Sequence, residues 1–196
     1  MKKHLTLFIA FVSLLSSVPL RAQTEKGKYL VGGSADISML FQGKNSTFNL
    51  SLAPQFGAFV IKGFAVGARY SFSVGSSKVY DFGKHRYTTT TTFSSAIGPQ
   101  LRYYLGKKPL RGVFTFSANY LTALTMKSTP GVGTSISGNS GFNLTGVVGA
   151  AYFFNPHISL ETGLYVIGQD FMQQLPITRI GFTAGFFMFL DNKKKE

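Results

Sequence analysis

The chain contains no cysteine and no long uninterrupted apolar run, and only seven of its 196 residues are acidic. Without cysteine it can form neither a disulfide nor the lipid-modified cysteine of a lipoprotein. Only two histidines, His85 and His157, lie beyond the first few residues, which is too few for a metal site when no cysteine can assist. We therefore predict no metal and no other cofactor.

The one apolar stretch near the N-terminus is "LTLFIAFVSLLSSVPL", which follows "MKKH" and precedes "RAQ". It is interrupted by Ser and Pro and falls short of the ~18 apolar residues of a membrane-spanning helix. A basic start, a short apolar stretch and Ala22 before Gln23 are the parts of a secretory signal peptide. We expect cleavage after Ala22, so that residues 1–22 are removed and residues 23–196 form one exported domain.

The chain is strongly basic, with a formal net charge of +13, which falls to +10 when Lys2, Lys3 and Arg21 leave with the signal peptide. Such a charge predicts an anionic partner, either lipopolysaccharide phosphate or nucleic acid. The basic residues are scattered over turns, loops and the tail at 193–195, and no basic stripe is interleaved with aromatics. This distribution excludes nucleic acid and leaves outer-membrane lipid and lipopolysaccharide.

Glycine and phenylalanine are abundant, at 22 and 20 residues, and no segment beyond the signal peptide has a helical period. The stretch "TRIGFTAGFFMFL" (Thr178 to Leu190) alternates instead. One face is wholly apolar, and the other is small or charged until Phe187 and Phe189 join it. A period of two predicts a strand. Taken alone, this strand suits either a soluble sandwich or a membrane barrel.

Seven earlier segments alternate in the same way: 29–41, 48–60, 64–74, 93–105, 114–124, 142–154 and 158–167. No charged residue falls on any of the eight large apolar faces, and five fall on the opposite faces: Asp36, Arg69, Arg102, Glu161 and Arg179. Five charges are too few for a water-facing surface. Each segment also reaches the ~9–11 residues of a tilted spanning strand. The sequence therefore predicts an all-β protein, an eight-stranded antiparallel up-and-down transmembrane β-barrel.

The connectors between these segments alternate in length. Three are tight, at 61–64, 105–111 and 154–158, and four are mostly longer, at 42–47, 75–90, 127–141 and 169–176. Short periplasmic turns and longer extracellular loops are typical of outer-membrane barrels, so both termini should be periplasmic. The loops at 75–90 and 127–141 carry the basic residues that could bind an anionic extracellular ligand: Lys78, Lys84, Arg86 and Lys127.

Three stretches carry a family resemblance: "QFGAFVIKGFAVGARYSF" (55–72), "AIGPQLRYYLGKK" (96–108) and "FFNPHISLETGLYV" (153–166). With them the chain resembles the porin-like outer-membrane β-barrel proteins of the Bacteroidetes type, which are related in shape to OmpX and the OmpA barrel. The resemblance implies a small barrel in the outer membrane of a Gram-negative cell, and it implies little about activity. We expect a monomer.

The lumen charges should pair, because the interior of an eight-stranded barrel is only wide enough for side chains and a buried charge needs a partner. Asp36 and Arg179 lie at similar heights on the first and last strands, which must meet, so we expect them within ion-pairing distance. Glu161 and Arg102 both lie low on their strands and should approach each other across the lumen, with Arg69 nearby.

Two groups of residues have the types that catalysis needs, and neither predicts an enzyme. In "HISLE", His157, Ser159 and Glu161 would share one face, but at the periplasmic end of the lumen, where a lipid A deacylase could not meet its substrate. In "DFGKHR", Asp81 and His85 have no evident second acidic partner. The stretch "PGVGTSISG" lacks the third glycine of a dinucleotide fingerprint, so it predicts a flexible loop. Thr88–Thr92 predicts a strand extension.

The sequence thus favours a non-enzymatic outer-membrane barrel whose lumen is largely filled by side chains. Its role would be structural or adhesive and would depend on the extracellular loops. A narrow porin that passes ions or small solutes remains the alternative, because the same lumen charges could line a pore. A hydrolase acting on lipid A is a third and weaker alternative.

Overall fold

The computed structural model describes residues 24–42, 45–81, 86–106, 109–131, 133–169 and 177–191. It contains eight strands: β1 (Tyr29–Gln42), β2 (Asn45–Ile61), β3 (Phe64–Asp81), β4 (Arg86–Leu105), β5 (Leu110–Thr129), β6 (Gly133–Asn155), β7 (Ile158–Gln169) and β8 (Ile177–Leu190). Among these residues no helix is long and apolar enough to cross a membrane.

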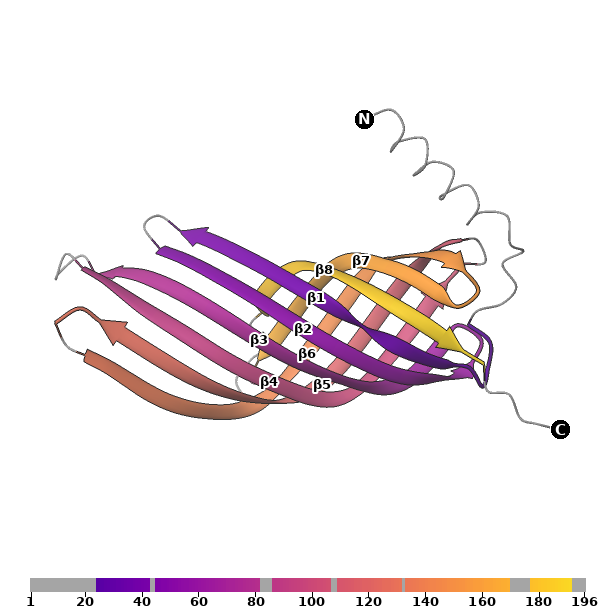
Figure 1. Ribbon diagram of the computed structural model, residues 1–196, viewed down its shortest axis with the longest axis horizontal. Helices are drawn as coiled ribbons and strands as arrows, with labels where there is room; N and C mark the ends of the chain where they lie inside the picture. Colours follow the sequence, from indigo (N-terminus) through magenta and orange to yellow (C-terminus); the bar gives the residue numbers. More distant parts are fainter. Residues whose placement is uncertain are drawn as a thin grey trace, which may run out of the picture.

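The strands form a closed barrel in which each one pairs with its neighbours in the sequence and β1 pairs with β8 (Figure 1). All of these pairs are antiparallel, as tight reversals between consecutive strands require. We call the end where β1 begins and β8 ends the terminal end, and the end of the β1–β2, β3–β4 and β5–β6 hairpins the distal end. The predicted eight-stranded up-and-down barrel is confirmed.

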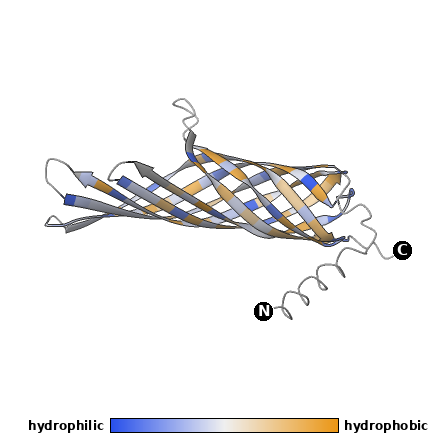
Figure 2. Cartoon of the chain, turned by 90° about the horizontal axis from the view of Figure 1, so that it is seen from above, coloured by the Kyte–Doolittle hydropathy of each residue, from blue (hydrophilic) through white to orange (hydrophobic). Residues whose placement is uncertain are grey.

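The alternation seen in the sequence separates the two faces of the barrel wall. Large apolar side chains of every strand point outward and stay exposed, for example Leu52 at 57%, Phe142 at 63% and Leu164 at 63%. The five predicted lumen charges lie on the opposite face. In Figure 2 the hydrophobic colour is densest on the closed ring of the barrel, toward the terminal end. A continuous exposed apolar surface of this kind is stable in lipid and unfavourable in water.

The distal hairpins differ from the sequence prediction. Residues 75–90 and 127–141 were expected to be loops, but β3 continues to Asp81, β4 starts at Arg86, β5 continues to Thr129 and β6 starts at Gly133. Most of both regions is therefore paired strand that projects beyond β7 and β8 (Figure 1). The strand extension predicted for Thr88–Thr92 is confirmed. The flexible loop predicted at Pro130–Gly138 is wrong from Gly133 onward, because residues 133–138 pair with residues 124–129 of β5.

Two prolines lie inside strands, where a missing N–H removes a ladder bond. The β2–β3 register is the same on both sides of Pro54, yet Ala53 and Pro54 have no paired residue on β3. The β4–β5 register likewise continues past Gly98 and Pro99, which are unpaired on the β5 side. The chain thus accommodates each proline by a local gap in one ladder and not by a bulge.

Strands β6 and β7 approach each other so closely at one point that only glycine fits there. Gly149 and Gly163 face each other across β6 and β7, and a Cβ at Gly149 would lie within 2.1 Å of the Thr162 carbonyl oxygen. We expect Gly149→Ala to lower the free energy of unfolding by about 1–3 kcal/mol, because the backbones must separate. The measurement is urea unfolding of the barrel in detergent micelles.

The matched control for that variant is Gly138→Ala on the same strand, where a Cβ would meet only the Leu124 side chain at 3.8 Å. It should leave stability within about 0.5 kcal/mol of the unaltered chain. Equal losses in the two variants would contradict the assigned β6–β7 approach.

Candidate functional site

The terminal end of the lumen is closed by apolar side chains from several strands. The nine members of this apolar plug are each at most 4% exposed: Leu30, Phe59, Ala65, Tyr104, Val113, Ala151, Phe153, Phe187 and Phe189. The Phe189 ring lies 5.0 Å from that of Phe153 and 6.0 Å from that of Phe59, measured between centroids. Aromatic contacts of this kind add to the area that the rings bury. The plug fills the section of lumen next to the terminal turns.

Residues ahead of β1 complete this closure. The Gly27 N–H donates to the Phe59 carbonyl at 2.8 Å, and the Gly63 N–H donates to the Thr24 carbonyl at 2.8 Å. Thr24 is buried, and its hydroxyl accepts a hydrogen bond from the Arg111 guanidinium at 3.0 Å. Arg111 in turn stacks over the Phe153 ring at 4.5 Å. The segment at 24–28 therefore packs against the plug and covers part of the terminal mouth.

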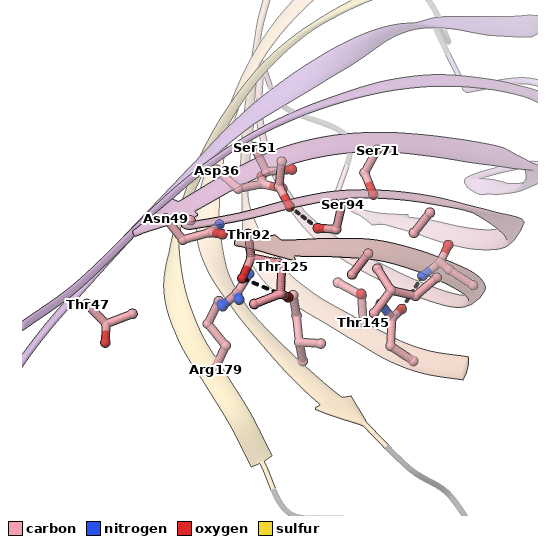
Figure 3. Close-up of a pocket in the computed structure, with 18 of the residues that line it drawn as sticks. Asp36, Thr47, Asn49, Ser51, Ser71, Thr92, Ser94, Thr125, Thr145 and Arg179 are labelled. Carbon is pink, nitrogen blue, oxygen red and sulfur yellow. Dashed lines mark hydrogen bonds between the residues drawn. The ribbon is translucent and has the colours of Figure 1, made fainter. Parts of the chain in front are cut away.

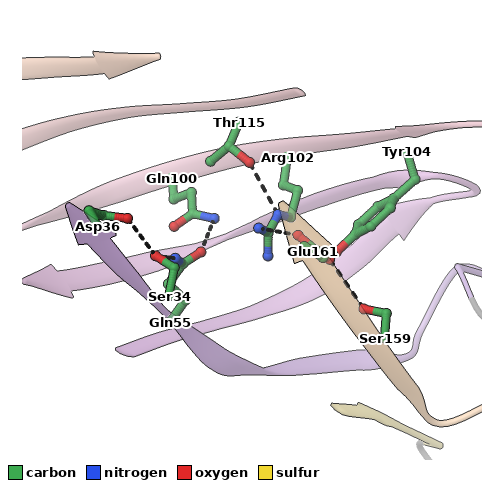
Figure 4. Close-up of polar contacts among 9 residues, drawn as sticks. All are labelled: Ser34, Asp36, Gln55, Gln100, Arg102, Tyr104, Thr115, Ser159 and Glu161. Carbon is green, nitrogen blue, oxygen red and sulfur yellow. Dashed lines mark hydrogen bonds and ion pairs between the residues drawn. The ribbon is translucent and has the colours of Figure 1, made fainter. Parts of the chain in front are cut away.

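A buried ion pair adjoins the plug, since its Arg102 guanidinium lies 4.0 Å over the Phe187 ring. Figure 4 shows this pair. Arg102 Nη2 on β4 lies 2.8 Å from Glu161 Oε2 on β7, and both side chains are about 6–7% exposed. Glu161 also accepts hydrogen bonds from the Tyr104 hydroxyl at 2.7 Å and the Ser159 hydroxyl at 3.3 Å. Arg102 donates further to Thr115 at 3.2 Å. The predicted approach of Arg102 and Glu161 across the lumen is confirmed.

The second buried ion pair joins different partners from those expected. Asp36 Oδ2 lies 2.6 Å from Arg69 Nη2, and among the residues that the structure describes no carboxylate pairs with Arg179. The expected Asp36–Arg179 pair is therefore wrong. In the β1–β8 ladder Asp36 lies opposite Thr183, and Arg179 is four residues farther toward the distal end. Because the strands are tilted, residues at the same height in the barrel are offset by a few positions from one strand to the next. The alternation along a single strand does not reveal this offset.

A chain of neutral polar side chains continues from this second pair. Ser34 donates to Asp36 at 3.2 Å, Gln55 donates to Ser34 at 3.3 Å, and Gln100 donates to Gln55 at 2.8 Å (Figure 4). Between the two ion pairs remains a gap of about 20 Å³. That volume is on the order of one water molecule. The middle of the lumen is thus filled by polar side chains, most of them hydrogen-bonded, although Gln100 Oε1 and Arg102 Nη1 have no partner.

Above the Asp36–Arg69 pair the lumen opens into a distal cavity of about 300 Å³ (Figure 3). Its lining is mostly hydroxyl and amide side chains, with Arg179 and the Asp36–Arg69 pair as its charged groups. Neighbouring hydroxyls bond to each other across the strands, Ser73 to Ser94 at 2.6 Å and Thr92 to Thr125 at 3.3 Å. The lumen therefore has three sections: an apolar plug, a filled polar middle that contains both ion pairs, and an open polar cavity.

The fold is similar to those of solved outer-membrane proteins. The outer membrane protein OprG from Pseudomonas aeruginosa aligns with a TM-score of 0.59 at 13% identity, covering 86% of this chain and 99% of that one. A major outer membrane protein from Thermus thermophilus aligns with a TM-score of 0.52 at 15% identity, covering 85% and 100%. The chain has the fold of an outer-membrane β-barrel. No protein-family model and no curated protein matches the sequence. Membership of the Bacteroidetes-type group stays a prediction.

The barrel separates the basic residues that the sequence grouped as a loop cluster. Lys78 lies on β3 opposite Thr89, on the outer face of the distal extension. Lys127 lies on β5 opposite Thr90, which lines the distal cavity, so its register position is on the inner face. Arg86 is the first residue of β4 and donates to the Pro130 carbonyl at 2.9 Å. Lys84 lies outside the described residues. These three positions are thus on strands, not in loops.

The His157, Ser159 and Glu161 side chains considered from the sequence are only partly connected in the barrel. Ser159 donates to Glu161, but His157 lies exposed in the β6–β7 turn, with Nδ1 3.0 Å from the Phe189 carbonyl oxygen. The hydrogen bond that the His157 ring makes is thus to the backbone of β8 and not to Ser159 or Glu161. Of the second group, His85 lies outside the described residues. Within the described part of the chain, no three His, Cys, Asp or Glu side chains gather as metal ligands.

Two features of the lumen were missed by sequence reasoning. The plug was signalled by large residues on the otherwise small face, at the terminal ends of strands: Leu30, Phe59, Tyr104, Phe153, Phe187 and Phe189. The distal cavity also contains buried polar atoms without a hydrogen-bond partner, on Asn49, Asn119 and Tyr165. No pattern in the sequence identifies these unpartnered atoms, because whether they find a partner depends on how wide the lumen is at their height.

Proposed function

We propose that this protein is a non-enzymatic outer-membrane barrel that does not conduct and acts at the cell surface in a structural or adhesive role. The observation that supports this most is the lumen, whose terminal section is occupied by the apolar plug and whose middle is occupied by two buried ion pairs. Because these packed side chains fill the terminal and middle sections of the lumen, we expect contacts with other molecules at the distal end. The outward apolar surface supports insertion in lipid.

The distal extension is the part of the barrel suited to such contact. Strands β3 to β6 project beyond the paired ends of β7 and β8, since the β6–β7 ladder stops at Asn143 and Gln169 (Figure 1). Lys78 and Lys127 are exposed there on opposite faces. In the proposed orientation both termini are periplasmic and the extension faces outside. Basic side chains on two faces would favour phosphate-bearing or other anionic surfaces, lipopolysaccharide among them.

A variant that shortens both hairpins tests this proposal. Residues 78–89 and 127–135 are each replaced by Asn-Gly, so that the register partners Ser77 and Thr90, and Met126 and Ile136, are joined by two-residue turns. Cells displaying the shortened barrel should adhere at least tenfold less to a lipopolysaccharide-coated surface. Heat-modifiable electrophoretic mobility should still report a folded barrel.

A control with full-length hairpins separates charge from shape. In it Lys78, Lys84, Arg86 and Lys127 are replaced by glutamine, and a further control, Lys62→Gln, removes one exposed charge from the β2–β3 turn. We expect the four-residue variant to lose most adhesion and Lys62→Gln to lose none. Adhesion that survives the shortening of both hairpins would overturn the proposed role of the extension.

The narrow porin is the alternative function, and the polar distal cavity is the observation that favours it. Solutes entering that cavity would still need a route past the Arg102–Glu161 pair and the apolar plug. Moving an ion through such a section requires the displacement of paired charges and packed rings. The plugged barrel is therefore the better supported proposal.

A further inference from the structure

The distal cavity contains donor and acceptor atoms that are buried and unused. Asn49, Asn119 and Tyr165 line the cavity and are 3%, 4% and 2% exposed. Asn49 Nδ2, Asn119 Oδ1 and the Tyr165 hydroxyl each lack a hydrogen-bond partner, although Asn119 Nδ2 donates to Asn143 at 2.9 Å. Buried polar atoms are nearly always paired in proteins, so unpaired ones that line a cavity indicate a bound polar molecule.

Among the residues that the structure describes, the charges that line the cavity are also unbalanced. Asp36 and Arg69 neutralise each other at its floor, which leaves the half-buried Arg179 as the one unneutralised charge among the described lining residues. Figure 3 shows the Arg179 side chain among the hydroxyl-bearing residues of the cavity, with Thr92 and Thr125 also labelled. A cation without a carboxylate partner in a confined polar site favours an anionic group on the ligand.

The Tyr165 hydroxyl is held in place by its packing. A Cβ at Gly181 of β8 would lie 2.6 Å from ring atoms of Tyr165, so the ring lies directly over this glycine. Gly181 is two residues from Arg179 on the same strand, which places both on the lumen face. The two strands β7 and β8 thus bring a fixed hydroxyl and a cation to the same side of the cavity.

We propose that the distal cavity binds one carboxylate-bearing sugar residue of the uronic acid type. The unused atoms on Asn49, Asn119 and Tyr165 include both donors and acceptors, so their ligand must offer both. Sugar hydroxyls donate and accept hydrogen bonds and meet this requirement. The sugar carboxylate pairs with Arg179. A volume of about 300 Å³ is at the lower end of small-ligand sites and suits a single residue at the end of a longer chain. The inference rests on the proposed orientation, in which the cavity opens outside.

Calorimetric titration of the folded barrel in micelles tests this site, with glucuronic acid as the probe and glucose as the neutral probe of the same size. We expect glucuronic acid to bind at least tenfold more tightly than glucose. Arg179→Gln should abolish that preference, and Tyr165→Phe should weaken both sugars. Lys62→Gln, which removes a charge at the terminal end, should change neither.

Two further arms identify where the acidic sugar comes from and separate this site from the proposed adhesion. An oligosaccharide ending in glucuronic acid represents a glycan from outside, and lipopolysaccharide represents the cell's own surface. The barrel with shortened hairpins retains the cavity residues and should still bind glucuronic acid, even if adhesion fails. Equal affinity for glucose and glucuronic acid, loss of binding in Lys62→Gln, or no binding in any arm would overturn the proposal.

Discussion

Replacement of Arg102 by methionine is expected to lower the free energy of unfolding by about 3–5 kcal/mol, because it leaves the Glu161 carboxyl group buried without its cationic partner. The Arg102 guanidinium lies 2.8 Å from that carboxylate and 4.0 Å above the Phe187 ring, so the variant loses an ion pair and a stacked contact together. The Tyr104 and Ser159 hydroxyls would remain as partners of Glu161. Urea unfolding in micelles measures the loss.

Adding Glu161→Leu to Arg102→Met should recover part of that stability, since an apolar pair can replace a buried ion pair of similar volume. Recovery should be incomplete, because the Tyr104 and Ser159 hydroxyls then lack an acceptor. The control is Lys28→Met, which removes the more exposed ion pair with Asp191 and should cost about 0–1 kcal/mol. A loss in Arg102→Met no larger than that in Lys28→Met would contradict a buried, closed middle section.

Truncation of Phe189 to alanine is the second change with a large expected effect. Its ring is completely buried and lies within 6.0 Å of the Phe59, Tyr104 and Phe153 rings. Removing a ring from such a cluster costs about 3–5 kcal/mol, from lost transfer energy and from the cavity that remains. The midpoint of thermal unfolding in micelles should fall accordingly.

Phe186→Ala is the matched control, because Phe186 is on the same strand but points outward and is 49% exposed. Its truncation leaves no enclosed cavity, so we expect a clearly smaller loss than for Phe189. Equal losses at the two positions would mean that the lumen at this level is not packed.

The strands were predictable because their alternation is a local property of the sequence. Phe182 and Ala184 on one face and Thr183 and Gly185 on the other already indicate which side meets lipid. The distal hairpins were not predictable in this way. Residues such as Thr90 and Ser137 pair as strands, but the stretches around them are rich in Thr, Ser and Gly, and this composition resembles that of a loop.

The lumen contacts were predictable only in part, because they depend on the stagger between strands. Arg102 and Glu161 were brought together by height alone, whereas the same reasoning gave Asp36 the wrong partner. Arg69 reaches Asp36 at 2.6 Å although neither is the other's register neighbour. Long arginine side chains in a narrow, tilted barrel can meet a carboxylate several residues away along the strand. The sequence therefore identifies the lumen charges but not all of their pairs.

Single-channel recording of the unaltered barrel in planar bilayers tests the central claim most directly. The plug and the two buried ion pairs predict a folded, inserted protein that produces no discrete conductance steps. Phe153→Ala combined with Phe189→Ala and Arg102→Gln removes two rings of the plug and the ion pair beside it. This variant supplies the comparison and should conduct if these side chains are what closes the lumen. Regular steps from the unaltered barrel, with a size or ion preference that changes in Arg102→Gln, would contradict the plugged lumen and establish a pore.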